Sequence, residues 1–413
     1  MINYYKNILT LSGGTLVSQI ILILSVPFIT RIFSPSDLGV AAFFIAIANI
    51  LSVISTGKYD LAIFLPKNKI WVENLFFASI FINIILLIVI ILVIIPVNIF
   101  LNFYFNYSLI WYCTIPCLFF LNGINTSLNA LLNKKQLYSY ISISRIIRDI
   151  LLTFFTIFFG LLFSNPIFII LSHILSLSII NFLLIYISSK KNLFNFSKIN
   201  FNRIIVLVKK YSDFPFLSMP SAFINILSSQ APIIMLSAYF GTSIAGMYSL
   251  VNRFMGAPSK LISSSTSEVF RQKATDEYNK NQNCKVLYLK TLKSLFILSL
   301  IPFFIIIIFG PQLFLFIFGE DWLQAGYYAR YLSLFFIFQF CISPLGFTLI
   351  ISKRQKYNFY WQLILLVLTN LGLFIGYYLG SPDFSIICFS CLYSIMYLFY
   401  FKESYNAAKG MAS

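Results

Sequence analysis

Residues 81–95 read FINIILLIVIILVII, an apolar run in which Asn83 is the single polar residue. Similar runs recur along all 413 residues, and a helix needs about 20 mostly apolar residues to cross a bilayer. Strands of an outer-membrane barrel would alternate apolar and polar residues instead. The chain is 59% hydrophobic and only 10% charged. A typical soluble domain has about 25% charged residues. These observations exclude a water-soluble enzyme and predict an all-α integral membrane protein.

Twelve membrane spans are predicted from these runs and from turn signals such as Ser34-Pro35-Ser36-Asp37. The longest polar stretch between two spans, residues 190–213, divides six spans from six. We therefore expect an N-terminal lobe (1–189), a cytoplasmic linker (190–213) and a C-terminal lobe (214–413), with the two lobes around a central cavity. The predicted spans are 9–30, 39–57, 75–97, 108–132, 146–163, 166–189, 214–239, 244–267, 291–311, 326–351, 358–379 and 384–402.

Positive charge predicts the orientation of these spans. The chain has 29 Lys and Arg residues against 12 Asp and Glu, a net charge of +17. Counted together with the span ends that border them, the termini and the connections after even-numbered spans hold 25 of the 29, whereas the connections after odd-numbered spans hold only Arg31 and Arg330. Because cytoplasmic loops are enriched in Lys and Arg, both termini are predicted to be cytoplasmic. The charge thus indicates membrane orientation rather than binding to nucleic acid.

A short motif is repeated at half the chain length. Phe33-x-x-Ser36-x-x-Gly39 recurs 207 positions later as Phe240-x-x-Ser243-x-x-Gly246. Each copy lies in the turn between the first two spans of a half. Because each half has an even number of spans, both halves enter the membrane in the same orientation. The repeat therefore predicts two parallel six-helix copies related by an axis along the membrane normal.

Charged residues inside a span are informative, because each costs about 2.5–3.5 kcal/mol at the bilayer centre unless it faces protein or water. Arg253 and Lys260 lie two turns apart on one face of span 244–267, with Asn252 and most of its serines. One interpretation is that both cations extend to the membrane surfaces, and the other is that they line a cavity. Since Arg253 lies roughly 13 Å inside the span, the cavity is favoured. A cationic cavity implies an anionic passenger.

Three further arginines have two interpretations each. Arg145 and Arg148 stand at the start of span 146–163. They either anchor the helix at the interface, with an Arg145–Asp149 ion pair one turn apart, or form a clamp for a phosphate group. Arg31 ends the first span and is either an interfacial anchor or a contact for an anion.

Lys58, Asp60 and His173 are candidates for coupling or gating. Lys58 and Asp60 end the second span, where the alternative is an exposed helix end. His173 lies in span 166–189, where it either forms a hydrogen bond between helices or relays a proton.

No pattern for a metal, nucleotide or catalytic site is found in the sequence. His173 is the single histidine, which excludes a histidine-based metal cluster. Five of the six cysteines lie in apolar runs, and Cys388-x-x-Cys391 is interpreted as helix packing within the bilayer. Gly241 and Gly246 are followed by Met247 rather than by the lysine of a phosphate-binding loop. We expect no cofactor, no metal and no enzymatic activity.

Five segments in the right order resemble the polysaccharide transporter family. They are Gly14-Thr15 with Gln19, Pro27-Phe28-Ile29-Thr30-Arg31 with Pro35 and Gly39, Tyr59 to Lys67, Gly246 to Arg253 followed by Pro258 and Val269-Phe270, and Ser343-Pro344-Leu345 with Gln355-Lys356. The resemblance spans most of the chain. It is strongest to the O-antigen flippase (Wzx) group of the multidrug/oligosaccharidyl-lipid/polysaccharide (MOP) exporter superfamily.

That resemblance implies a function and a location. The family is held to move undecaprenyl-pyrophosphate-linked oligosaccharide from the inner to the outer leaflet of the bacterial inner (plasma) membrane by alternating access. It implies contacts with membrane lipids and with other O-antigen assembly proteins, and a role in lipopolysaccharide biosynthesis. The charged positions that match family motifs are Arg31, Asp60 and Arg253, whereas Lys260, Arg145 and Arg148 come from helix geometry.

Two other functions are compared with the flippase. A drug/cation antiporter of the same superfamily should carry acids in its cavity, whereas this sequence places cations there. A membrane enzyme such as the O-antigen polymerase would need large loops on the far side of the membrane, and the predicted loops there are very short.

Overall fold

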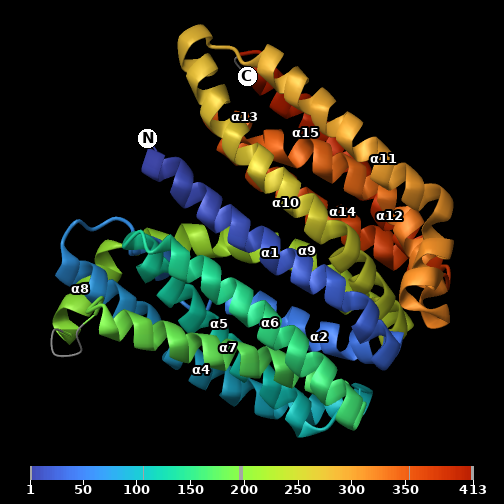
Figure 1. Ribbon diagram of the computed structural model, residues 1–413, viewed down its shortest axis with the longest axis horizontal. Helices are drawn as coiled ribbons and strands as arrows, with labels where there is room; N and C mark the ends of the chain where they lie inside the picture. The colour runs from blue at the N-terminus through green and yellow to red at the C-terminus, as the bar shows by residue number, and fades with distance from the viewer. Residues whose placement is uncertain (1, 106, 195–198, 353, 411–413) are drawn as a thin grey trace. The chain divides into compact units, whose positions relative to one another are not determined.

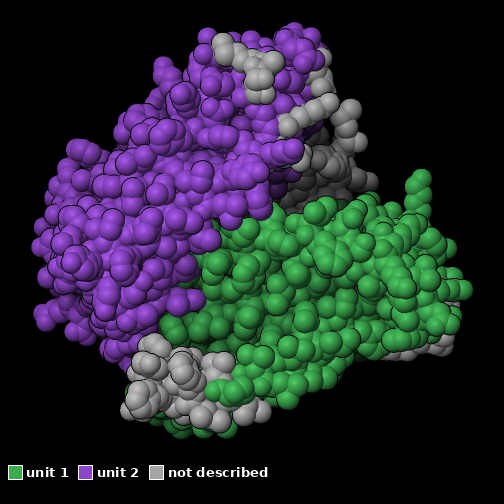
Figure 2. Space-filling view, turned by 180° about the vertical axis from the view of Figure 1, so that it is seen from behind, with its two compact units in different colours: residues 1–25, 40–230 green, residues 26–39, 231–413 purple. Residues whose placement is uncertain are grey.

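The computed structural model describes residues 2–105, 107–194, 199–352 and 354–410 (Figure 1). These residues form helices joined by turns, with no strand among them. They divide into two compact units (Figure 2). Unit 1 comprises residues 1–25 and 40–230, and unit 2 comprises residues 26–39 and 231–413.

The helices up to residue 240 lie mainly in unit 1. In chain order they are α1 (Ile2–Ile32), α2 (Pro35–Ser52), α3 (Tyr59–Ala62), α4 (Lys69–Phe105), α5 (Leu109–Lys134), α6 (Tyr138–Phe163), α7 (Ile167–Lys190), α8 (Phe201–Lys210), a π-helix (Phe214–Ser218) and α9 (Met219–Phe240). The later helices lie in unit 2. They are α10 (Thr242–Asn281), α11 (Lys285–Phe318), a 3-10 turn (Glu320–Trp322), α12 (Leu323–Ile342), a second 3-10 turn (Ser343–Gly346), α13 (Phe347–Ile351), α14 (Gln355–Tyr378) and α15 (Pro382–Ala408).

Within the described residues, eleven helical stretches are long and apolar enough to cross a membrane. Each overlaps one of the predicted spans, although some bounds differ by several residues, and the overlap confirms an all-helical integral membrane protein. The remaining prediction, 244–267, falls in α10, a helix of 40 residues. At about 1.5 Å per residue α10 is long enough to cross, but its serines, asparagines and charges lower its hydropathy below that of the other spans.

The apolar run 81–95 lies in α4, and its one polar side chain is fully buried. Asn83 Nδ2 donates a hydrogen bond of 3.0 Å to the Phe120 carbonyl of α5. Gly123 of α5 makes room for this contact, because a Cβ atom there would overlap the Asn83 amide. The polar group thus joins two helices, as asparagine often does inside a bilayer.

Residues 190–213, expected to form a linker, are docked on unit 1 where the structure describes them. Ile204 and Leu207 of α8 are buried in the same core as Leu75 of α4. Lys69 Nζ donates to the Asn192 carbonyl at 3.1 Å, so the start of α4 also holds the end of α7. Apolar burial makes this segment part of unit 1. The chain passes between the units within α1, within α2 and within α9 instead. The expected lobes 1–189 and 214–413 stay a prediction.

Unit 2 is held together by aromatic side chains and a few polar contacts. Trp322 is buried, and its indole Nε1 donates to the Thr30 carbonyl at 3.2 Å, which fixes the end of α1 in this unit. The hydroxyls of Tyr288 on α11 and Ser404 on α15 are 2.7 Å apart. The repeated motif copies also meet here, because a Cβ atom on Gly39 would overlap the Thr242 carbonyl oxygen.

A cationic polar pocket as the candidate functional site

A cavity of about 280 Å³ opens between helices α5, α6 and α7 of unit 1. Its lining is polar except for one aliphatic residue, and it consists of Asn125, Thr126, Asn129, Ser144, Arg145, Arg148 and Ile180. These side chains belong to segments that are long and apolar enough to cross a membrane. Exposing polar and charged groups of such segments to lipid costs free energy, so these groups are expected to face a pocket in the protein.

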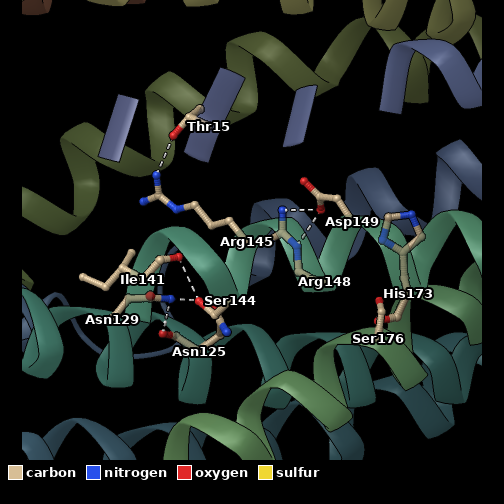
Figure 3. A network of polar contacts seen from close by, with 10 residues as sticks. All are labelled: Thr15, Asn125, Asn129, Ile141, Ser144, Arg145, Arg148, Asp149, His173 and Ser176. Carbon is tan, nitrogen blue, oxygen red and sulfur yellow. Dashed lines mark hydrogen bonds and ion pairs between the residues drawn. The ribbon is translucent and has the colours of Figure 1, made fainter. Parts of the chain in front are cut away.

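The two arginines of α6 point to different partners (Figure 3). Arg145 reaches α1, where its Nη1 donates to the Thr15 hydroxyl at 2.9 Å. Arg148 turns to its neighbour in sequence, and its Nε and Nη2 both lie 2.9 Å from Asp149 Oδ1. The ion pair of Asp149 is therefore with Arg148 and not with Arg145, the pair considered from the sequence. Side-chain direction on the helix, rather than the spacing of one turn, decides the partner.

The charges around the pocket do not cancel. Asp149 is only 1% exposed and forms its ion pair with Arg148, whose side chain is 37% exposed. Arg145 has a neutral partner in Thr15. These three ionisable groups together carry one net positive charge. The pocket is consequently suited to an anion.

Asparagine side chains bonded to one another support the wall of the pocket on the α5 side. Asn129 Nδ2 donates to both the carbonyl and the Oδ1 of Asn125, each at 2.8 Å. Asn125 Nδ2 donates to Asn181 Oδ1 at 2.9 Å, and Asn181 donates in turn to the Leu121 carbonyl. This chain of bonds fixes the amide orientations, because Asn129 Nδ2 faces two oxygen atoms. A wall held in this way is arranged before a ligand arrives.

These asparagines were absent from the site residues expected from the sequence. The signal was present, because Asn122, Asn125, Asn129 and Asn133 recur every three or four residues and so share one face of a helix. Hydropathy predicts the span 108–132 but does not distinguish a lipid-facing polar residue from an internal one.

Other expected site residues of unit 1 lie outside the lining of this pocket. His173 is half-buried on α7, and its carbonyl accepts from the Ser176 hydroxyl at 3.0 Å (Figure 3). Asp60 is buried in α3 and accepts a hydrogen bond of 2.5 Å from the Thr56 hydroxyl. The alternative of an exposed helix end is therefore wrong for Asp60. Lys58 is half-buried and precedes α3 with a left-handed backbone, at a φ of 60°.

The remaining expected cations belong to unit 2. Arg253 is half-buried and Lys260 is exposed, both on α10. The polar face of α10 is divided, because Ser259 is buried and Ser263 donates to the Phe340 carbonyl of α12 at 3.4 Å. The cations thus lie beside the packed part of the face rather than at its centre. Arg31 is exposed at the end of α1.

Metal-binding residues do not gather in the part of the chain that the structure describes. No group of three or more His, Cys, Asp or Glu side chains there could hold a metal ion.

A family model described as "Polysaccharide biosynthesis protein" matches residues 28–326 of the chain. The teichuronic acid biosynthesis protein TuaB of Bacillus subtilis (strain 168) is 26% identical over 176 residues, which are 42% of this chain and 36% of that protein. The chain thus matches about a third of the length of that curated relative.

Two solved structures share the fold. Lipid II flippase MurJ in an inward closed conformation has a TM-score of 0.75 at 14% identity, covering 95% of this chain and 87% of that chain. An inward-facing multidrug resistance MATE family transporter of the MOP superfamily has a TM-score of 0.67 at 14% identity, covering 94% and 93%. Together with the family model, which covers more than half of the sequence, these likenesses show that the chain belongs to the polysaccharide biosynthesis protein family and has the fold of MOP-superfamily transporters.

Proposed function

We propose that this protein is a flippase for undecaprenyl-pyrophosphate-linked oligosaccharide, the O-antigen unit, in the bacterial inner membrane. The net positive charge at the pocket supports this proposal most directly, because Arg145 and Arg148 line the pocket and Asp149 pairs with Arg148. A pyrophosphate cannot cross about 30 Å of hydrocarbon without compensating charge. Guanidinium groups compensate it well, because they form paired hydrogen bonds with phosphate oxygens.

The passenger's head group would meet the cations in sequence during alternating access. Arg145 and Arg148 would receive the pyrophosphate from the cytoplasm, Arg253 and Lys260 would hold it midway, and Arg31 would meet it near the exit. At about 280 Å³ the pocket is slightly smaller than the sites that enclose drug-sized ligands, about 300–1,000 Å³. It therefore suits a phosphate group with at most an adjoining sugar, while the lipid tail stays in the bilayer.

The orientation and the coupling residues complete the proposal. Both termini face the cytoplasm, as the distribution of Lys and Arg predicts. Asp60, Lys58 and His173 serve in coupling or gating, and the burial of the Asp60 carboxylate supports its part in this. The passenger crosses without any change of covalent bonds, so the protein is not an enzyme. Other O-antigen assembly proteins are proposed partners.

A flipping assay in proteoliposomes tests this function. The substrate is a polyprenyl-pyrophosphate disaccharide with a fluorophore on the sugar, and a membrane-impermeant quencher reports which leaflet holds it. Losing a hydrogen-bonded charge costs about 1.5–3 kcal/mol, so Arg145→Ala is expected to slow flipping roughly tenfold to a hundredfold. Arg145→Lys should be intermediate, since lysine keeps the charge without the paired geometry.

Two controls make the assay decisive. Lys290→Ala removes an exposed cation of α11 and should leave the rate unchanged. Transport of an organic cation such as ethidium is measured in the same vesicles. Efflux of ethidium without flipping of the lipid would contradict the flippase and favour the drug/cation antiporter. A normal flipping rate for Arg145→Ala would show that the pocket is not on the transport path.

A further inference from the structure

Helix α8 is fixed to unit 1 by one of its faces. Ile204 and Leu207 are buried against the start of α4. The Tyr59 hydroxyl donates to the Val208 carbonyl at 2.9 Å, and Asn200 caps the helix by accepting from the Arg203 backbone nitrogen at 3.1 Å. The position of α8 relative to the membrane span Lys69–Ile94 is therefore defined.

The remaining faces of α8 expose apolar side chains. Phe201 is 66% exposed, Ile205 is 41% exposed and Val206 is 63% exposed. At about 100° per residue, Phe201 and Ile205 lie next to each other along one flank of the buried face. Exposure of these three apolar side chains to water is energetically unfavourable.

The same helix is strongly cationic. Its sequence FNRIIVLVKK has no acidic residue, and Arg203, Lys209 and Lys210 are all exposed. Lys210 Nζ lies 4.4 Å from the ring centroid of Trp71, at the start of α4. Tryptophan is enriched where membrane spans meet the aqueous phase. Further exposed cations, Lys190 and Lys191, end the neighbouring span.

We infer that α8 is an interfacial helix that binds anionic phospholipids of the membrane in which the protein sits. Apolar side chains combined with Lys and Arg are typical of helices that lie in the headgroup region of anionic bilayers. An acidic protein would satisfy the charge as well, but α8 is packed at the level where α4 begins its span, so the bilayer is the apolar surface already beside it. This inference does not depend on the passenger.

Photo-crosslinking tests the inference on the full chain. Phe201 is replaced by p-benzoylphenylalanine, which keeps an aromatic side chain, in vesicles that contain equal amounts of phosphatidylethanolamine and phosphatidylglycerol. Mass spectrometry then identifies the lipids attached after irradiation. Phosphatidylglycerol adducts should exceed phosphatidylethanolamine adducts by about fivefold or more, the factor that corresponds to one Lys or Arg near an anionic surface.

Matched variants separate charge from position. The triple change Arg203→Gln, Lys209→Gln and Lys210→Gln should abolish the preference while lipid adducts still form. The same change at Lys285, Lys290 and Lys293 of α11 should leave the preference intact. The photoreactive residue at Leu92, an exposed position within the α4 span, should show no preference. Adducts in equal amounts at position 201 would overturn the inference, as would crosslinks in cell membranes to a protein rather than to lipid.

Discussion

Gly39 and Gly246 make equivalent contacts with each other's helix. The space beside Gly39 is filled by the Thr242 carbonyl oxygen, and the space beside Gly246 is filled by the Pro35 carbonyl oxygen. Thr242 precedes Gly246 by four residues, as Pro35 precedes Gly39. Each copy of the repeated motif therefore places its glycine against the same backbone carbonyl of the other copy. This reciprocal contact supports an origin of the two copies by duplication.

A side chain at either glycine should destabilise the protein. A Cβ atom on Gly39 overlaps backbone of α10, which cannot move aside as a flexible side chain could, and overpacking costs about 1–3 kcal/mol. Gly39→Ala should lower the thermal midpoint of the purified protein in detergent. The control is Gly13→Ala, because nothing lies within 4 Å of an added Cβ there. An unchanged midpoint for Gly39→Ala would mean that the two helices separate readily.

The buried carboxylate of Asp149 should be needed to keep Arg148 in place. Removing one partner of a fully buried pair costs about 3–5 kcal/mol, because the other charge is left uncompensated. Arg148 is 37% exposed, so water can solvate the charge that remains, and Asp149→Asn should lower thermal stability by less than that range. The double change Arg148→Gln with Asp149→Asn should recover part of the loss, since no charge is then stranded. A double variant that is as unstable as the sum of the single changes would show that the pair contributes no coupling.

Arg253 should be required for transport. Its half-buried side chain is compatible both with lining a cavity and with extending to the membrane surface, so a variant decides between them. Its guanidinium can hold a pyrophosphate by paired hydrogen bonds, whereas lysine offers a single point charge. Arg253→Ala should abolish O-antigen display at normal protein levels, measured by gel electrophoresis of lipopolysaccharide, and Arg253→Lys should restore it in part. Normal display with alanine would show that the side chain merely extends to the membrane surface.

The thiol of Cys284 should resist modification at neutral pH. Burial, reinforced by the nearby Glu277 carboxylate, raises the pKa of this thiol to about 11. Because the thiolate is the reactive form, the protonated thiol persists until the pH approaches that value. Maleimide at pH 7 should leave Cys284 unlabelled in the folded protein and label it after denaturation, as measured by mass spectrometry.

A matched variant shows whether maleimide can reach the turn between α10 and α11. Asn283→Cys combined with Cys284→Ser places the thiol one position earlier, at an exposed residue. This thiol should react at pH 7. Equal labelling of the native Cys284 would contradict the buried position.

The fold was largely predictable from the sequence because span length and apolar content are local properties. The run 81–95 is recognisable without its neighbours, and so is the repeated turn at Gly39 and Gly246. The site was less predictable. The partner of Arg145 is Thr15, 130 residues earlier, and no local pattern indicates such a contact.

Two features depend on packing that a sequence pattern does not show. The stretch 190–213 is polar in sequence, yet the few apolar residues of α8 align on one side and dock this helix on α4. Likewise α10 presents a single broad polar face in sequence, and packing against α12 divides it. In both cases the neighbouring helix, and not the pattern itself, decides which side chains face water.

The bond from Asn83 to the Phe120 carbonyl has a consequence for how the chain is made. During synthesis α4 emerges from the ribosome before α5 and is apolar enough to leave the translocon for lipid on its own. Its amide donor would then sit in hydrocarbon, where no water can satisfy it, until the carbonyl of residue 120 arrives. Release of the two helices as one hairpin avoids that interval. The single polar residue in the most apolar run thus links the biogenesis of one span to the arrival of the next.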